Sequence, residues 1–80
     1  MSKTEKLIAK LKQTESTYAW RDLVALLTRI GYTKQEMAGS RIRFSKQGSL
    51  ILLHKPHPEN EIKGKALKAI KDTLRQEHLL

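Results

Sequence analysis

The chain contains no cysteine, and this absence removes several classes of function. Neither a disulfide framework, nor a thiolate nucleophile, nor a cysteine-based metal site is possible. The chain therefore has no need of an oxidising compartment. No apolar run approaches the length of a membrane-spanning helix, and residues 2–12 are too charged for the apolar region of a signal peptide. We expect a soluble protein of the cytoplasm that does not associate with membranes.

Acidic residues are also scarce. Eight Asp and Glu stand against 16 Lys and Arg, which gives a formal net charge of +8 over 80 residues. Such an excess favours polyanions, because a basic protein releases the counterions condensed on nucleic acid. The few carboxylates are scattered, so an enzyme built on paired carboxylates is not indicated. Nucleic acid is the partner that this charge indicates, and an acidic protein or simple solubility are the alternatives.

Glycine and proline are rare, and they mark the boundaries of the expected elements. Ser2 and Glu5 form a capping box for a first helix that reaches about Gln13. A polar connection precedes a second helix from near Ala19 to Ile30, whose apolar residues recur at helical spacing. Gly31 stands where a glycine commonly ends a helix. We expect one domain over residues 1–80.

Three short strands are expected next. The segment from Tyr32 to Met37 predicts an edge strand. From Arg41 to Lys46 basic and apolar residues alternate, which predicts a half-buried strand with one basic face. After a turn at Gly48-Ser49, the run Leu50–Leu53 is apolar without alternation, so we expect a central strand that is covered on both faces or largely buried.

The last element is predicted to be a helix. Pro56 and Pro58 end the sheet, and Asn60 is a suitable N-cap for a helix that reaches about His78. Gly64 would weaken the interior of this helix, so it indicates either close packing or a later helix start. The prediction is an α+β fold in the order ααβββα, with a three-stranded antiparallel sheet packed by helices. Trp20 is expected in its core.

The ordered motifs resemble the HicA family, the toxins of HicA–HicB toxin–antitoxin pairs. The resemblance covers roughly Trp20 to Leu74, and it implies that residues 1–15 are an N-terminal helical extension relative to the shortest members. Its residues are Trp20 and Leu23 on a helix, Leu27 followed by Gly31-Tyr32, Gly39-Ser40 before a strand with Phe44, His57-Pro58, and Glu61-Ile62-Lys63-Gly64. The resemblance implies a fold like that of double-stranded-RNA-binding domains. It also implies an endoribonuclease that cuts messenger RNA and inhibits translation, without a cofactor, and a HicB-like antitoxin that binds and masks it.

One position departs from the family. Members commonly carry a histidine just after the Gly-Ser pair, and that histidine is the catalytic residue that the resemblance implies. Here Arg41 occupies this position, and an arginine stays protonated, so it cannot act as a general base. Either another residue has taken the catalytic role, or the chain binds RNA without cutting it. The chain resembles a branch with Gly-Ser-Arg and Leu-His-Lys-Pro-His-Pro together, which favours transfer of the role to His54 or His57.

Histidine suits metal-free RNA cleavage, because its unperturbed pKa lies near neutrality and it can serve as acid or base. His54 and His57 are therefore the candidate catalytic residues. Cations would stabilise charge on the phosphoryl oxygens and contact the RNA backbone; the candidates are Arg41, Arg43, Lys55, Lys65 and Lys68. His54 and His57 have no further obvious ligands beside them for a metal ion.

Each candidate also has a structural interpretation. His54 could simply end a strand, and His57 could belong to a rigid His-Pro loop. Lys65 and Lys68 could form an ordinary solvated helix face. Arg41 and Arg43 could dock against an acidic antitoxin. Three functions therefore stay open at this point: a ribonuclease toxin, an RNA-binding module without catalysis, and a protein-interaction element.

Overall fold

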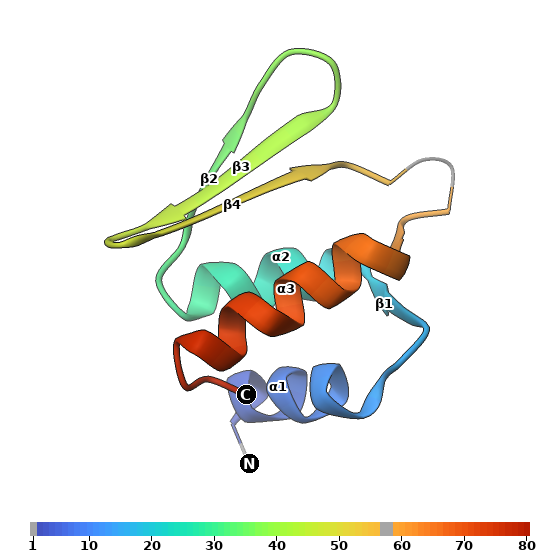
Figure 1. Ribbon diagram of the computed structural model, residues 1–80, viewed down its shortest axis with the longest axis vertical. Helices are drawn as coiled ribbons and strands as arrows, with labels where there is room; N and C mark the ends of the chain where they lie inside the picture. Colours follow the sequence, from blue (N-terminus) through green and yellow to red (C-terminus); the bar gives the residue numbers. More distant parts are fainter. Residues whose placement is uncertain (1, 57–58) are drawn as a thin grey trace.

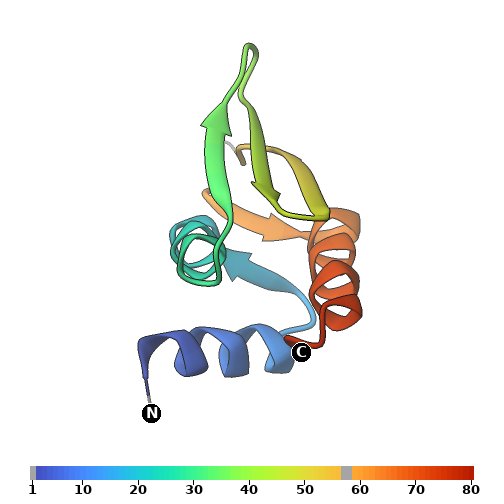
Figure 2. The ribbon, with the colours of Figure 1, turned by 90° about the vertical axis from the view of Figure 1, so that its left-hand side faces the viewer.

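The structure is a computed structural model that describes residues 2–56 and 59–80. Within these residues the helices and strands form three layers (Figure 1). The sheet β2-β3-β4 lies on one side, α2 and α3 pack beneath it, and α1 lies on the far side of these helices (Figure 2). The bounds are α1 Lys3–Gln13, β1 Thr17–Ala19, α2 Trp20–Arg29, β2 Thr33–Glu36, β3 Arg41–Lys46, β4 Ser49–His54, β5 Glu61–Lys63 and α3 Gly64–Gln76.

Helix α1 begins as the capping box predicts. The Ser2 Oγ accepts a hydrogen bond of 3.1 Å from the Glu5 backbone N–H. Leu7 and Leu11 point into the core, and the Tyr18 hydroxyl donates a buried bond of 2.9 Å to the Leu7 carbonyl. Burial, with a smaller contribution from the charge of Asp22, raises the pKa of Tyr18 to about 12. The N-terminal helix is therefore attached to the rest of the domain through its buried face.

The predicted start of the last helix is wrong. Glu61–Lys63 form a strand, β5, that pairs antiparallel with β1, so that Tyr18 faces Ile62. Asn60 is no N-cap; it has a left-handed φ of 53°, and its carbonyl accepts the Trp20 N–H at 2.9 Å. Strands β1 and β5 have only three residues each and are far apart in the sequence, so no local sequence pattern predicts them. Helix α3 begins at Gly64, whose φ of 61° is readily available only to glycine, so the later helix start was the correct alternative.

The sheet follows the order β2-β3-β4. The edge position predicted for the first of these strands is confirmed by β2, which is exposed throughout. The central, doubly covered position predicted for Leu50–Leu53 is wrong, since β4 is the other edge strand. Leu50 is 52% exposed and Leu52 60% exposed. The central strand is instead β3, whose alternating pattern is confirmed by exposed Arg41 and Arg43, which alternate with buried Ile42 and Phe44.

The core lies between the inner face of this sheet and the helices. Ile42, Phe44, Ile51 and Leu53 supply the sheet side, and the helices contribute apolar stripes that include Leu23, Leu27, Leu67, Ile70 and Leu74. The predicted core position of Trp20 is confirmed, because its ring meets Phe44 edge to face with centroids 6.2 Å apart. The α+β class, with helices packed on a three-stranded antiparallel sheet, is also confirmed. In the described residues no helix has the length and apolar character to cross a membrane.

Candidate nucleic-acid interface

The register of the β3–β4 hairpin brings two of the predicted residues together. Arg41, the first residue of β3, is directly opposite His54, the last residue of β4. A turn with left-handed residues at Gly39 and Ser40 (φ 72° and 65°) fixes where β3 begins. The Lys55 N–H then donates to the Ser40 carbonyl at 2.8 Å and extends the pairing beyond His54. The Gly-Ser pair thus sets the register that makes Arg41 and His54 neighbours.

Arg41 and His54 line a shared hollow of about 190 Å³, together with Ile42, Leu52 and Leu53. Both polar side chains are exposed, and the lining contains no carboxylate. An imidazole that solvent can reach, next to a permanent cation, is suited to a phosphate ester. Within residues 2–56 and 59–80, no three side chains of the metal-ligating types gather into a site.

Lys55 faces a different hollow. This cavity of about 440 Å³ is lined by Ala19, Trp20, Arg21, Lys55, Glu59, Asn60 and Glu61. Arg21 is a second cation here that the sequence reasoning missed, because the unpredicted β1–β5 pairing brings the start of α2 beside this segment. Glu59 forms an ion pair of 2.8 Å with Lys63, and that hydrogen bond and charge lower the pKa of the Glu59 carboxyl. The hollow therefore carries charges of both signs.

His57 lies outside the described residues. The structure therefore positions one of the two candidate catalytic histidines, His54, and the role of His57 stays a prediction.

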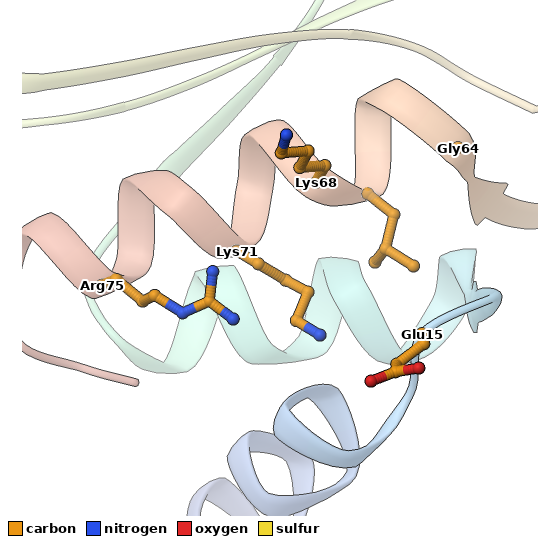
Figure 3. Close-up of a pocket in the computed structure, with 6 residues that line it drawn as sticks. Glu15, Gly64, Lys68, Lys71 and Arg75 are labelled. Atoms are coloured by element: carbon orange, nitrogen blue, oxygen red, sulfur yellow. The ribbon is translucent and has the colours of Figure 1, made fainter.

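The lysines predicted on the last helix belong to another surface. Lys65 and Lys68 are exposed on α3, whereas the outer face of the sheet points away from this helix (Figure 2). Lys68 borders a groove of about 340 Å³ with Glu15, Gly64, Leu67, Lys71 and Arg75 (Figure 3). In this groove the Lys71 Nζ donates to the Thr14 carbonyl at 2.7 Å, and Arg75 pairs with Asp72 at 3.2 Å. The structure thus separates the α3 lysines from the Arg41–His54 pair.

A polar cluster at the turn end of the hairpin was not predicted. The Glu77 carboxylate accepts hydrogen bonds from the Tyr32 and Ser49 hydroxyls, the latter at 3.1 Å, and Lys46 Nζ lies 3.4 Å from it. The Tyr32 hydrogen bond is the largest cause of a lowered Glu77 pKa, while burial raises the pKa of Tyr32. We call these four residues the Glu77 cluster. They tie the end of α3 to the hairpin. No local pattern predicts the cluster, because Tyr32, the turn of the hairpin and Glu77 are far apart in the sequence.

Comparison with known proteins identifies a family that matches most of the chain. Residues 20–78 match the model of a family described as the HicA toxin of bacterial toxin–antitoxin systems. The matched part begins at α2 and includes the sheet, the β3–β4 hairpin and α3, and it leaves α1 outside. No curated protein and no solved structure matches the chain, so its likeness to double-stranded-RNA-binding domains stays a prediction.

Proposed function

Because this chain belongs to the HicA family of toxins from bacterial toxin–antitoxin systems, we propose that it is an endoribonuclease. It cuts messenger RNA in the cytoplasm, inhibits translation and is neutralised by a HicB-like antitoxin. The observation that carries this proposal is the pairing of Arg41 with His54 across the strands of one hairpin.

This pairing offers a way for catalysis to survive the loss of the usual histidine. The side chains of directly opposed residues in an antiparallel pair start about 4.5–5.5 Å apart. An imidazole on His54 therefore begins one strand away from the position where the family commonly has its histidine. The catalytic role has moved from the first position of β3 to His54 on the neighbouring strand β4, and Arg41 binds phosphate instead.

The proposed reaction needs one base and one acid. The base removes the proton of an RNA 2′-hydroxyl, and the 2′-oxygen forms a bond to the adjacent phosphorus as the bond from phosphorus to the 5′-oxygen breaks. The acid delivers a proton to that leaving 5′-oxygen, so the products are a 2′,3′-cyclic phosphate and a 5′-hydroxyl. His54 fills one of these roles and His57 the other, while Arg41 binds the phosphoryl oxygens on which charge accumulates.

The remaining cations hold the RNA. Arg43 lies two residues after Arg41 on the same exposed face of β3, and Lys55 follows His54. Arg43 contacts a phosphate next to the cleaved bond, and Lys55, which faces the neighbouring hollow, contacts a phosphate beyond it. Lys65 and Lys68 project from α3 and contact phosphates farther along the RNA chain. Such phosphate contacts position the RNA without reading its sequence.

The test is induced expression of the wild type and of His54→Ala, His57→Ala and the double variant, with growth and messenger-RNA ends measured together. The wild type should arrest growth and leave fragments with cyclic-phosphate ends. Loss of a general acid or base should slow cleavage by about 10²- to 10⁴-fold. His78→Asn is the matched control, since His78 is exposed beyond α3 and has a left-handed φ that asparagine tolerates. Undiminished fragmentation by the double variant would refute the proposed chemistry.

A second function follows if Arg41 marks a real loss of catalysis. The protein would then inhibit translation by occupying RNA, as a binding module whose affinity falls with added salt. Growth arrest without RNA fragments, unchanged in both histidine variants, would establish this alternative. The permanently charged guanidinium at the usual histidine position is the observation that favours it.

A further inference from the structure

The hollow that Lys55 faces has the size and the mixed polarity of a small-ligand site. Its volume of about 440 Å³ falls within the ~300–1,000 Å³ of pockets that hold small ligands. Ala19 and Trp20 supply an apolar wall, and the polar lining consists of Arg21, Lys55, Glu59, Asn60 and Glu61. We call this cavity the Lys55 hollow. A ligand that suits it offers apolar surface, hydrogen-bond donors for the carboxylates and acceptors for the cations.

Main-chain hydrogen bonds bring a cation and a carboxylate to opposite walls of the Lys55 hollow. Glu61 stands opposite Ala19 in the β1–β5 ladder, and the Trp20 N–H donates to the Asn60 carbonyl at 2.9 Å. These bonds join the start of α2, which carries Arg21, to the strand that carries Glu61. In the part of the chain that the structure describes, neither Arg21 nor Glu61 forms an ion pair. A set of donors and a set of acceptors therefore line one site.

We propose that the Lys55 hollow is a guanine subsite, which binds the base of the nucleotide next to the cleaved bond. This inference rests on the proposed function, since it assigns a base preference to that same ribonuclease. Guanine has adjacent donors at N1 and N2 for the two oxygens of Glu61. It also has adjacent acceptors at O6 and N7 for the guanidinium of Arg21. Lys55 binds the phosphate of the same nucleotide.

Other ligands match this lining less well. Adenine and cytosine present an acceptor ring nitrogen where the Glu61 carboxylate requires a donor, and uracil presents only one donor there. A lone phosphate would be repelled by the carboxylates of Glu59 and Glu61. A metal ion would lack ligands, since no three His, Cys, Asp or Glu side chains gather among the described residues. Guanine is the base whose donors and acceptors both find partners.

The Lys55 hollow is also next to the proposed cleavage site. Arg41 and His54 line one hollow, and the following residue, Lys55, lines the other. The Lys55 N–H bond of 2.8 Å to the Ser40 carbonyl fixes this residue at the end of the hairpin. A base held in the Lys55 hollow therefore brings the neighbouring phosphodiester bond to the His54 imidazole. Binding of the base thus orients the RNA for cleavage.

Titration with the four nucleoside 3′,5′-bisphosphates tests the subsite without RNA cleavage. The full chain is produced as His54→Ala, which alters the neighbouring hollow and leaves the Lys55 hollow unchanged. NMR follows the backbone amides and the indole N–H of Trp20, the chain's only tryptophan and part of the lining. The guanosine compound should bind at least about 10-fold more tightly than the other three, as expected for a bidentate base contact.

Substitutions separate the contacts to the base from the contact to the phosphate. Glu61→Gln and Arg21→Gln should each reduce the preference for guanosine by about 10-fold. Lys55→Gln should weaken the binding of all four compounds by a similar factor, because a phosphate contact does not read the base. Glu15→Gln removes an exposed carboxylate from the groove along α3 and is the matched control, which should keep the full preference.

Cleavage supplies a second measurement. The bonds that the wild type cuts in cellular messenger RNA should be enriched for an adjacent guanine, and Glu61→Gln should lower this enrichment. Equal or absent binding of the four bisphosphates, or a preference for guanosine that survives in Glu61→Gln, would overturn the proposal. Cutting by the wild type without regard to base would also overturn it and would leave the ribonuclease proposal intact. If the wild type cuts no RNA, the ribonuclease proposal fails, and the titration still decides whether the hollow binds guanine.

Discussion

The β3–β4 hairpin puts its side chains to two different uses. On its inner face Ile42, Phe44, Ile51 and Leu53 are buried against the helices. On the outer face of the sheet, which we call the outer sheet face, the same two strands present Arg41, Arg43, Leu50, Leu52 and His54 to solvent. The period of two in a strand makes this division possible, since successive residues point to opposite faces.

The polar residues of the hairpin divide in the same way between its two ends. At the turn end Lys46 and Ser49 are engaged in the Glu77 cluster within the chain itself. At the open end no ion pair to Arg41 or His54 occurs among residues 2–56 and 59–80. We infer that the groups paired within the chain stabilise the fold, and we propose that the groups left exposed at the open end bind its partners. Three predictions test this division.

The largest effect is expected for Phe44→Ala. Phe44 is fully buried and contacts Trp20, so its truncation should lower the free energy of unfolding by about 3–5 kcal/mol. Since a domain of this length has a total of only roughly 4–12 kcal/mol, chemical unfolding of the variant should show a much reduced midpoint. Leu52→Ala, on the other face of the same hairpin, should change stability by no more than about 0.5 kcal/mol. Equal losses in the two variants would contradict the division between the faces.

The sequence predicts β3 well and β4 poorly for a physical reason. Alternation from Arg41 to Lys46 identifies both the strand and its faces. The run Leu50–Leu53 has no alternation, so the sequence cannot show that two of its leucines are left exposed; that follows only from the edge position of β4 in the sheet. Similarly, β1 and β5 are too short to be predicted from their own sequences. Each forms a strand only through its pairing with the other.

The candidate site was predictable in its residues but not in its grouping. Arg41, Arg43 and His54 stand out from their motifs and from the strand pattern. Their common surface, the separation of Lys65 and Lys68 from it, and the addition of Arg21 beside Lys55 all depend on tertiary packing. The Glu77 cluster is also a tertiary feature, since Tyr32, Ser49 and Glu77 are distant in sequence.

A medium effect is expected when the Glu77 cluster is altered. Glu77→Gln removes the charge that accepts the Tyr32 and Ser49 hydrogen bonds, and it should cost about 1–2 kcal/mol at pH 7. The folded-state pKa of Glu77 lies below its ordinary value of 4.5. Its contribution is therefore fully present above that value and is lost as the pH falls through the folded-state pKa. The stabilities of wild type and variant, measured by urea unfolding from pH 7 to pH 3, should converge at the acid end.

The matched control for this prediction is Glu36→Gln. Glu36 sits on the exposed edge strand β2 and is 3.7 Å from Lys34. Exposed pairs of this kind contribute little, about 0–1 kcal/mol, so the control should show a smaller loss and little change with pH. A Glu77 variant that is no less stable than this control would show that the turn end of the hairpin is not held by its polar cluster.

The smallest effect on the fold, with a distinct effect on binding, is expected for Arg43→Gln. Arg43 is exposed on the outer sheet face opposite Leu52, so its loss should change the free energy of unfolding by no more than about 0.5 kcal/mol. If Arg43 contacts one phosphate, the slope of log K against log [salt] for RNA binding should fall in magnitude by about 1. Lys34→Gln removes the same charge from the edge strand β2, where Lys34 already pairs with Glu36, and should leave the slope nearly unchanged. If both variants lower the slope equally, RNA responds only to the total charge of the protein, and the outer sheet face has no special part in holding it.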